Sequence, residues 1–253
     1  MARDVWCATD PTGTTGQPLT TTTAPAPVEP LPLRRLAILG TAPSWRQCPW
    51  QDQTLEIHGL NDAHILGYPR VTAWWDLHPI AAMTFYDRAR PPNPLTVPDG
   101  TYFRPAGHLE WLRSRPFPVF VPQARPDMPT SVTFPRDEVI AFWSRFWPWR
   151  VDRQGLIHAG RTYEVSTPAW MYAWAVMMNF REIHIYGVHL STEWEYVVQR
   201  PNLEFLMGVG AGLGVRNVLP AVAPICQHGA LYAYEAKHEV PLDALQREIH
   251  QIK

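Results

Sequence analysis

Small and hydroxyl-bearing residues follow an apolar run near the start of the chain, in a pattern that suits phosphate binding. After residues 36–39 come Gly40, Thr41, Ala42, Pro43 and Ser44. Gly40 allows the backbone to approach a ligand closely, and Thr41 and Ser44 can hydrogen-bond phosphate oxygens beside the free amides of a helix start. An ordinary turn between a strand and a helix, capped by Ser44, explains the same residues.

Polar side chains also stand directly after the other predicted strands. They are Asn61 and Asp62 after 55–60, Asp76 and His78 after 71–75, and His189 and Glu193 after 183–187. In open α/β sheets ligands bind outside the carboxyl ends of the strands. We therefore expect the functional site to be built from these residues together with the turn at 40–44.

The elements that must position these residues alternate along the chain from residue 34 onward. Strand patterns lie at 35–40, 55–60, 71–75, 118–121, 183–187 and 215–219, and helix patterns at 61–66, 106–114, 136–147, 168–180, 201–212 and 241–251. Such alternation predicts an α/β protein with a mostly parallel sheet and helices on both faces. The clearest helix start is Ser166-Thr167-Pro168, where a hydroxyl caps free amides and proline occupies the first turn.

Two segments depart from this alternation. Residues 1–33 are rich in threonine and proline and predict an extended or disordered arm, with docking on a partner subunit as the alternative. Residues 90–150 carry twelve prolines and an aromatic cluster, and predict an insertion or lid beside the sheet. The aromatic residues make either a stacking wall for a base or sugar or a small satellite core. Residues 34–253 otherwise form a single α/β domain.

Composition and missing motifs exclude several function classes. The formal net charge is -1, so no global attraction to nucleic acid or to an anionic membrane is expected. No apolar stretch is long enough for a transmembrane helix, and the three cysteines are widely spaced, which fits a reducing, cytoplasmic setting. The chain has no P-loop, no G-x-S-x-G and no H-E-x-x-H motif, so kinase, hydrolase and zinc-protease chemistry of those types is not predicted, and no metal site is expected.

The order of the motifs resembles the family 42 sialyltransferases. The matching segments are Leu-Gly-Thr-Ala-Pro-Ser at 39–44, Gly-Leu-Asn-Asp at 59–62, the helix start at 166–167 with Tyr172 inside the helix, and the strand at 180–188. The same order is similar to archaeal 6-hydroxymethylpterin pyrophosphokinases and to bacteriophage proteins of similar length. The resemblance covers residues 34 to about 220 and implies a Rossmann-like fold that binds a nucleotide.

What the resemblance implies for the site is specific. Ser44, Asn61, Ser166 and Thr167 match positions that contact the cytidine nucleotide in the sialyltransferases. Those enzymes use a histidine as the base on the acceptor hydroxyl, for which His189 and His228 are the candidates here, with Glu193 as an alternative carboxylate. The chain departs from the family pattern at Thr41, which replaces Asn, at Pro168, which replaces Gly, and at His189, which stands where Asp is usual.

The polar stretch at 191–204 supplies further candidates. Glu193, Tyr196, Gln199 and Arg200 can recognise an acceptor or a ribose, whereas a loop that caps the next helix with solvated charges explains them equally well. Arg200 or His78 can offset charge on a departing phosphate.

The predicted activity is glycosyl transfer from a nucleotide-sugar to a hydroxyl, without a metal or any other cofactor. A pyrophosphokinase-like transfer from ATP is the alternative enzyme, and it would need a divalent cation near Asp62, Asp76 and Glu193. A catalytically silent phage binding protein is the third hypothesis, in which the arm makes homo-oligomer or virion assembly contacts. The first two imply a cytoplasmic protein, in the host cytoplasm if a phage encodes it, and the third implies virion association.

Overall fold

The computed structural model describes residues 33–79, 107–148, 150–151, 153–158, 164–190 and 194–227. The chain divides into two compact units, Met1–Pro32 and Leu33–Lys253. The first unit, which covers nearly all of the predicted arm, lies outside the described residues, so the role of residues 1–33 stays a prediction. The predicted helix at 241–251 lies outside them as well.

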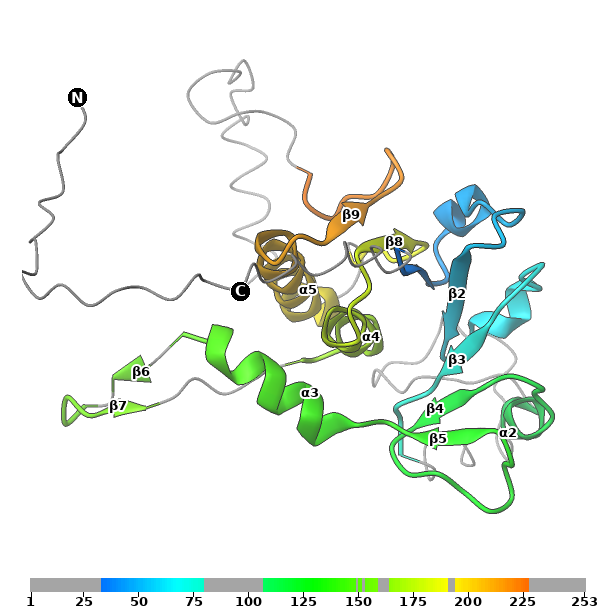
Figure 1. Cartoon of the computed structure of the whole chain (residues 1–253), viewed down its shortest axis with the longest axis horizontal. Coiled ribbons are helices and arrows are strands. Elements are labelled where there is room, and N and C mark those ends of the chain that lie inside the picture. Colours follow the sequence, from blue (N-terminus) through cyan, green and yellow to red (C-terminus); the bar gives the residue numbers. More distant parts are fainter. Residues whose placement is uncertain are drawn as a thin grey trace, which may run out of the picture. The chain divides into compact units, whose positions relative to one another are not determined.

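Seven strands form one sheet in which every neighbouring pair is parallel (Figure 1). They are β1 (Arg35–Leu39), β2 (Leu55–Leu60), β3 (Ala73–Trp75), β4 (Val119–Val121), β5 (Ser131–Thr133), β8 (Glu182–Tyr186) and β9 (Arg216–Val218). Their order in the sheet is β5-β4-β3-β2-β1-β8-β9. This arrangement confirms the predicted α/β, Rossmann-like class, and six of the seven strands lie where the sequence predicts them.

Helices cover both faces of the sheet. The α-helices are α2 (His108–Arg113), α3 (Arg136–Trp143), α4 (Thr167–Met177) and α5 (Trp194–Gly212). Short 3-10 helices follow strands at η1 (Pro43–Gln47) and η2 (Ala63–Leu66), and η3 (Ser144–Phe146) continues α3. A separate antiparallel pair joins β6 (Arg150–Val151) to β7 (Ile157–His158). None of the helices in the described ranges is long and apolar enough to span a membrane.

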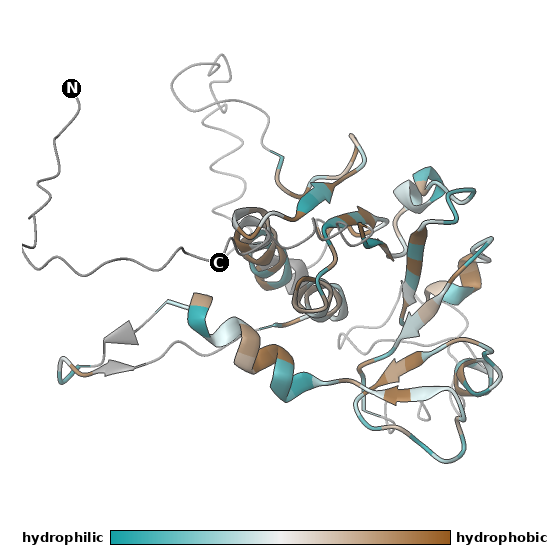
Figure 2. Cartoon of the chain, viewed as in Figure 1, coloured by the Kyte–Doolittle hydropathy of each residue, from teal (hydrophilic) through white to brown (hydrophobic). Residues whose placement is uncertain are grey.

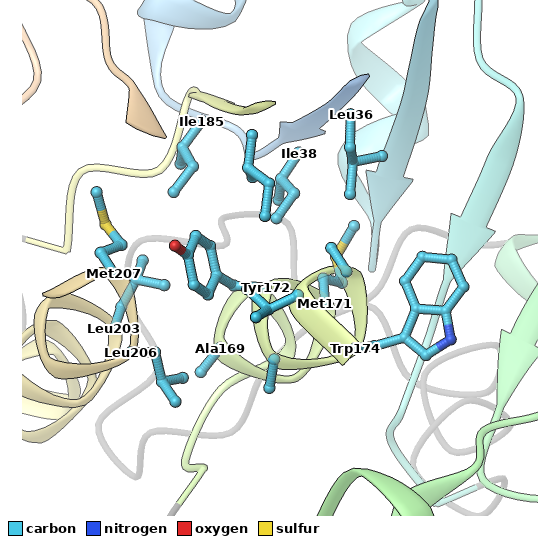
Figure 3. Close-up of a cluster of buried hydrophobic side chains, with 14 of the residues drawn as sticks. Leu36, Ile38, Ala169, Met171, Tyr172, Trp174, Ile185, Leu203, Leu206 and Met207 are labelled. Atoms are coloured by element: carbon cyan, nitrogen blue, oxygen red, sulfur yellow. The ribbon is translucent and has the colours of Figure 1, made fainter. Parts of the chain in front are cut away.

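Strand β1 lies at the centre of the core and is buried on both faces. Leu36 and Ile38 pack toward α4 and α5, whereas Ala37 and Leu39 belong to the cluster on the opposite face. Figure 3 shows the first face, where side chains of β1 and β8 meet Tyr172 of α4. A strand buried on both faces needs apolar residues at every position, which explains the continuous run that predicted it.

Helix α4 begins where the sequence predicts it. The Ser166 hydroxyl accepts a hydrogen bond from the backbone N–H of Ala169, at 3.3 Å, and so caps the helix. Helix α5 packs closely against α4 at Gly210, because a Cβ at this position would lie 2.2 Å from the Tyr172 hydroxyl oxygen. This contact joins the middle of α4 to α5.

The described part of residues 90–150 adds two strands to the sheet, and the predicted insertion or lid stays a prediction. Strands β4 and β5 pair in parallel with β3 and with each other, and prolines flank these three-residue strands without interrupting their ladders. Helix α3 then packs on α4; its first turn is hydrophilic and the residues after it are mostly hydrophobic (Figure 2). Trp143 and Trp147 are buried in the main core of the protein. The aromatic cluster therefore belongs to the main core and does not form a satellite core of its own.

Candidate functional site

The turns after β1 and β8 interlock at the point where the strand order reverses. The Gly40 N–H donates to the Tyr186 carbonyl at 2.8 Å, and the Ala42 N–H donates to the Gly187 carbonyl at 2.9 Å. A Cβ at Gly40 would lie 2.4 Å from the Gly187 oxygen, and a Cβ at Gly187 would lie 2.2 Å from the Gly40 oxygen. Only glycine fits at both positions, and Gly187 also has a φ of +70°.

Ser44 and His189 lie beneath these turns and bind each other. The Ser44 hydroxyl accepts from the Gly187 N–H at 2.9 Å, and its oxygen lies 2.9 Å from His189 Nε2. The hydroxyl can therefore donate its own proton to Nε2 when His189 is neutral. Ser44 is only 3% exposed. Ser44, which was predicted to bind phosphate, and His189, which was predicted to act as the base, thus hold the turn together.

A cavity of about 140 Å³ opens at the carboxyl ends of β1, β2 and β8, beside the start of α4. Seven residues that the sequence analysis selected line it: Gly40, Thr41, Asn61, His78, Ser166, Thr167 and Gln199. Apolar side chains that include Leu60, Val188 and Leu190 complete its walls. Tertiary structure thus brings the predicted turns together at the switch point of the sheet, where ligands bind in folds of this class.

Asn61 is held so that one end of its amide faces this cavity. Its backbone has a φ of 51°, its N–H donates to the Trp75 carbonyl at 2.8 Å, and its carbonyl accepts from the Trp74 indole at 2.9 Å. Its side-chain Oδ1 accepts from the Thr167 hydroxyl at 3.2 Å. Its Nδ2 makes no hydrogen bond to any residue in the described ranges and can donate to a ligand.

The amino end of α4 faces the same cavity through Ser166, Thr167 and Pro168. The positive end of the helix dipole favours an anion there. Because Pro168 has no N–H and Ser166 takes the amide of Ala169, the helix offers few free amides. The start of α4 can therefore contribute to anion binding mainly through the electrostatic attraction of its dipole.

A buried carboxylate holds two histidines at the carboxyl end of β3. Asp76 is fully buried, and its Oδ1 lies 2.9 Å from His78 Nδ1 while its Oδ2 lies 2.7 Å from His108 Nε2. The His78 side chain is 33% exposed and lines the cavity. When His78 donates from Nδ1 to Asp76, its Nε2 carries the lone pair that a general base needs. Sequence analysis missed His108, because nothing in its local pattern links it to Asp76.

A second, larger cavity of about 580 Å³ is lined by a different set of residues. Leu77, the neighbour of His78, lines it together with Trp170, which lies one turn into α4. The ring of Trp170 meets that of Phe134 edge to face, with centroids 5.2 Å apart. Arg136, Asp137 and Glu138, from the first turn of α3, line it as well. No motif marked these residues in the sequence.

The remaining predicted residues do not line the cavity or lie outside the described residues. Asp62 precedes η2 and does not line the cavity. Arg200 binds Glu204 on its own helix at 2.8 Å, as expected for a solvated helix charge. Glu193, His228 and the side chain of Tyr196 lie outside the described residues.

A search for a metal site covers only the residues that the structure describes. Among them, no group of three or more His, Cys, Asp or Glu side chains is placed to hold a metal ion. Both carboxylate oxygens of Asp76 are hydrogen-bonded to imidazoles, so this side chain is not placed to hold a cation against a phosphate.

Comparison with known proteins finds similarity only among solved structures. No protein-family model matches the chain, and no curated protein matches it by sequence. The chain is similar to the sialyltransferase CstII from Campylobacter jejuni in complex with cytidine-5'-monophosphate, at 11% identity and a TM-score of 0.40, over 74% of this chain and 79% of that one. A CstII complex with CMP-3FNeuAc gives 10% identity and a TM-score of 0.38, over 78% and 89% of the two chains. Neither similarity is high enough to transfer a ligand or an activity to this chain.

Proposed function

We propose that this protein transfers a sugar from a nucleotide-sugar to a hydroxyl acceptor, without a metal ion. One observation supports this proposal best. A cavity at the switch point of the sheet places the Asn61 amide and the amino end of α4 beside His78, an imidazole oriented by buried Asp76. The arrangement pairs an anion-binding wall with a general base, which are the two parts that glycosyl transfer needs.

The donor phosphate occupies the small cavity in this proposal. Thr41 is exposed, and its hydroxyl makes no hydrogen bond to the described residues, so it can bind a phosphate oxygen. The Nδ2 of Asn61 and the dipole of α4 add a donor and a positive potential. A volume of about 140 Å³ is below the range of sites that enclose whole small-molecule ligands. It therefore holds the phosphate and an adjoining ring, and the rest of the nucleotide extends beyond it.

His78 acts as the base. Its Nε2 removes the proton of the acceptor hydroxyl while that oxygen forms a bond to the anomeric carbon. The bond from this carbon to the phosphate oxygen breaks, and the nucleoside phosphate leaves with the electron pair toward the amino end of α4. Asp76 keeps the His78 ring oriented and stabilises the imidazolium that forms, and His108 holds Asp76 from its other oxygen.

The acceptor binds in the larger cavity of about 580 Å³ in this proposal. This volume is within the range that holds small-molecule ligands. The Trp170 ring offers a flat surface, and Asp137 and Glu138 can accept hydrogen bonds from hydroxyl groups. Leu77 of this cavity is the sequence neighbour of His78, which supports an acceptor site near the base.

Thermal shift with CMP, UDP, GDP, ATP and NAD, each with and without magnesium, tests the donor site. We expect one nucleotide to raise the melting temperature equally with and without magnesium, because a ligand that binds only the folded state stabilises it by mass action. Asn61→Asp keeps the amide's shape but replaces the Nδ2 donor with a negative charge, and should abolish the shift. Asp62→Asn, next to it and outside the cavity, is the matched control.

Two outcomes would contradict the proposal. One is that no nucleotide raises the melting temperature of the wild-type protein. The other is that Asn61→Asp binds nucleotide as tightly as the wild type. Release of nucleoside phosphate from the matching nucleotide-sugar then separates a transferase from a protein that only binds.

A further inference from the structure

A separate cavity of about 460 Å³ lies on the face of the sheet that is turned away from α4 and α5. It is independent of the site proposed above. Its lining combines aromatic and basic side chains, chiefly His64, Tyr68, Arg70, Trp74, Trp111 and Arg115.

The walls of this cavity are aromatic rings that support one another. The His64 imidazole stacks on Trp111 with ring centroids 4.3 Å apart and an interplanar angle of 27°. Trp74 meets Trp111 edge to face at 4.7 Å. Trp74 is 1% exposed, so the wall is anchored in the core and presents rings that do not need to be ordered on binding.

Two guanidinium groups line the same cavity without an ion-pair partner among the described residues. Arg70 donates from Nη2 to the backbone carbonyls of Asp52 and Leu55, at 2.8 and 3.0 Å. Arg115 donates from Nε to the Trp111 carbonyl at 2.8 Å, and its guanidinium lies 4.3 Å from a Trp111 ring centroid. The Nη1 atoms of both arginines make no hydrogen bond to residues in the described ranges.

A neighbouring arginine shows how these two differ. Arg113 lies on α2, two residues before Arg115, and pairs with both Glu110 and Asp127. Its charge is neutralised on the surface, as is usual for an exposed arginine. Arg70 is instead held by two backbone carbonyls, and Arg115 by a backbone carbonyl and the Ser114 hydroxyl. These neutral partners fix their geometry and leave both charges without a carboxylate partner among the described residues.

We propose that this cavity binds a small anion that carries an aromatic ring, such as an aryl phosphate or an aryl carboxylate. The two guanidinium groups attract the anion, and the Nη1 atom of each can donate to its oxygens. The ring of the ligand packs against Trp111 and Tyr68. An anion alone or an aromatic ring alone should bind more weakly than the whole ligand. The arginines interact with the charge, and the aromatic side chains interact with the flat apolar ring.

Calorimetric titration of the full-length protein with phenyl phosphate and with benzoate tests this proposal. At least one of them should bind, and the tighter probe identifies the anion. Inorganic phosphate and benzyl alcohol, which each carry one half of the ligand, should bind at least about tenfold more weakly. Arg70→Gln and Arg115→Gln should each weaken the tighter probe by about tenfold or more, since each removes a hydrogen bond to a charged group.

Matched variants separate this site from general charge effects and from the nucleotide site. Arg113→Gln removes the same charge two residues away, at the end of α2 and outside the cavity, and should leave the affinity within about twofold. Asn61→Asp should leave it unchanged as well. If Arg115→Gln loses its near-UV circular dichroism, Arg115→Lys keeps the charge without the fixed geometry of the guanidinium and should show an intermediate affinity.

Any of four results would overturn the proposal. Neither probe binds the wild-type protein, or both cavity variants bind like the wild type. Alternatively, Arg113→Gln weakens binding as much as they do, or Asn61→Asp abolishes it, which would move the ligand to the other cavity. None of these results shows whether nucleotides bind in the cavity beside Asn61.

Discussion

The two ends of strands β1 and β8 are built from different chemistry. At their amino ends, Arg35 pairs with Glu182 across the sheet at 2.8 Å, and Glu182 also binds His184 at 2.6 Å. At their carboxyl ends, Gly40 and Gly187 pack backbone against backbone, and the Ser44 hydroxyl accepts from the Gly187 N–H. The first end joins its strands by side-chain charge, whereas the second lets two turns approach so closely that no side chain fits between them.

We infer from this difference that one end of these two strands serves stability and the other end serves function. At the charged end, both carboxylate oxygens of Glu182 are paired with protein groups. The glycine end leaves polar groups such as Asn61 Nδ2 directed into a cavity. We therefore expect changes at the carboxyl end to alter ligand binding and activity, and changes at the amino end to alter only the stability of the fold.

The largest expected effect is on activity, at His78. His78→Gln removes the proposed base, so kcat/KM should fall by about 10²- to 10⁴-fold with the melting temperature nearly unchanged. His189→Gln should cost much less activity, because His189 binds Ser44 and does not line the cavity. Steady-state kinetics with the nucleotide-sugar found by the binding assay measures both. Equal losses of kcat/KM in the two variants would show that His78 is not the base.

A smaller but still large effect is expected from Gly187→Ala. The new Cβ would overlap the Gly40 carbonyl, and alanine is strained at a φ of +70°, so the free energy of unfolding should fall by about 2–4 kcal/mol. Nucleotide binding should weaken as well. Urea denaturation measures the first effect, with Gly208→Ala as control, because a Cβ at Gly208 meets nothing within 4 Å. A Gly187→Ala protein as stable as the wild type would refute the interlocked turn.

The smallest effect is expected at the charged end. Glu182→Gln should lower the free energy of unfolding at neutral pH by about 1–3 kcal/mol, since charge-assisted hydrogen bonds are weakened. Nucleotide affinity should stay the same.

The pH dependence sharpens this prediction. Burial would raise the pKa of Glu182, but hydrogen bonds from His184 and Arg35 hold it below its usual value of 4.5. The unfolded chain therefore binds this proton more readily than the folded one, so the contribution of Glu182 is present above about pH 4.5 and is lost as the pH falls through its folded pKa. Urea titrations between pH 3 and 7 should show a shallower slope for Glu182→Gln than for the wild type. Identical slopes would contradict the assignment.

Much of the fold follows from local patterns. The apolar runs at β1 and β2 predict buried strands almost to the residue, because central parallel strands need apolar side chains on both faces. Ser166 predicts the start of α4 because capping is a local interaction. Strand β5 was missed, since three residues between prolines and threonines show no periodicity and its strand character depends on pairing with β4.

The site is only partly visible in the sequence. Residues that follow strands, such as Thr41, Asn61 and His78, meet at one cavity because parallel strands end at the same edge of the sheet. The same rule also selected Ser44, His189 and Arg200, which bind other protein groups. Position after a strand places a residue at the edge, but it does not determine which way the side chain points.

By itself, the sequence determined the α/β class, the order of most elements and the edge of the sheet at which function is sought. These properties depend on hydrophobic periodicity, capping and glycine content, which act over a few neighbouring residues. Only the tertiary structure decided that Ser44 holds His189, that Asp76 joins His78 to His108, and that Arg70 and Arg115 share a cavity. Those relations join residues far apart in the chain, and hydrogen bonds and ion pairs form only after packing has fixed the distances between their atoms.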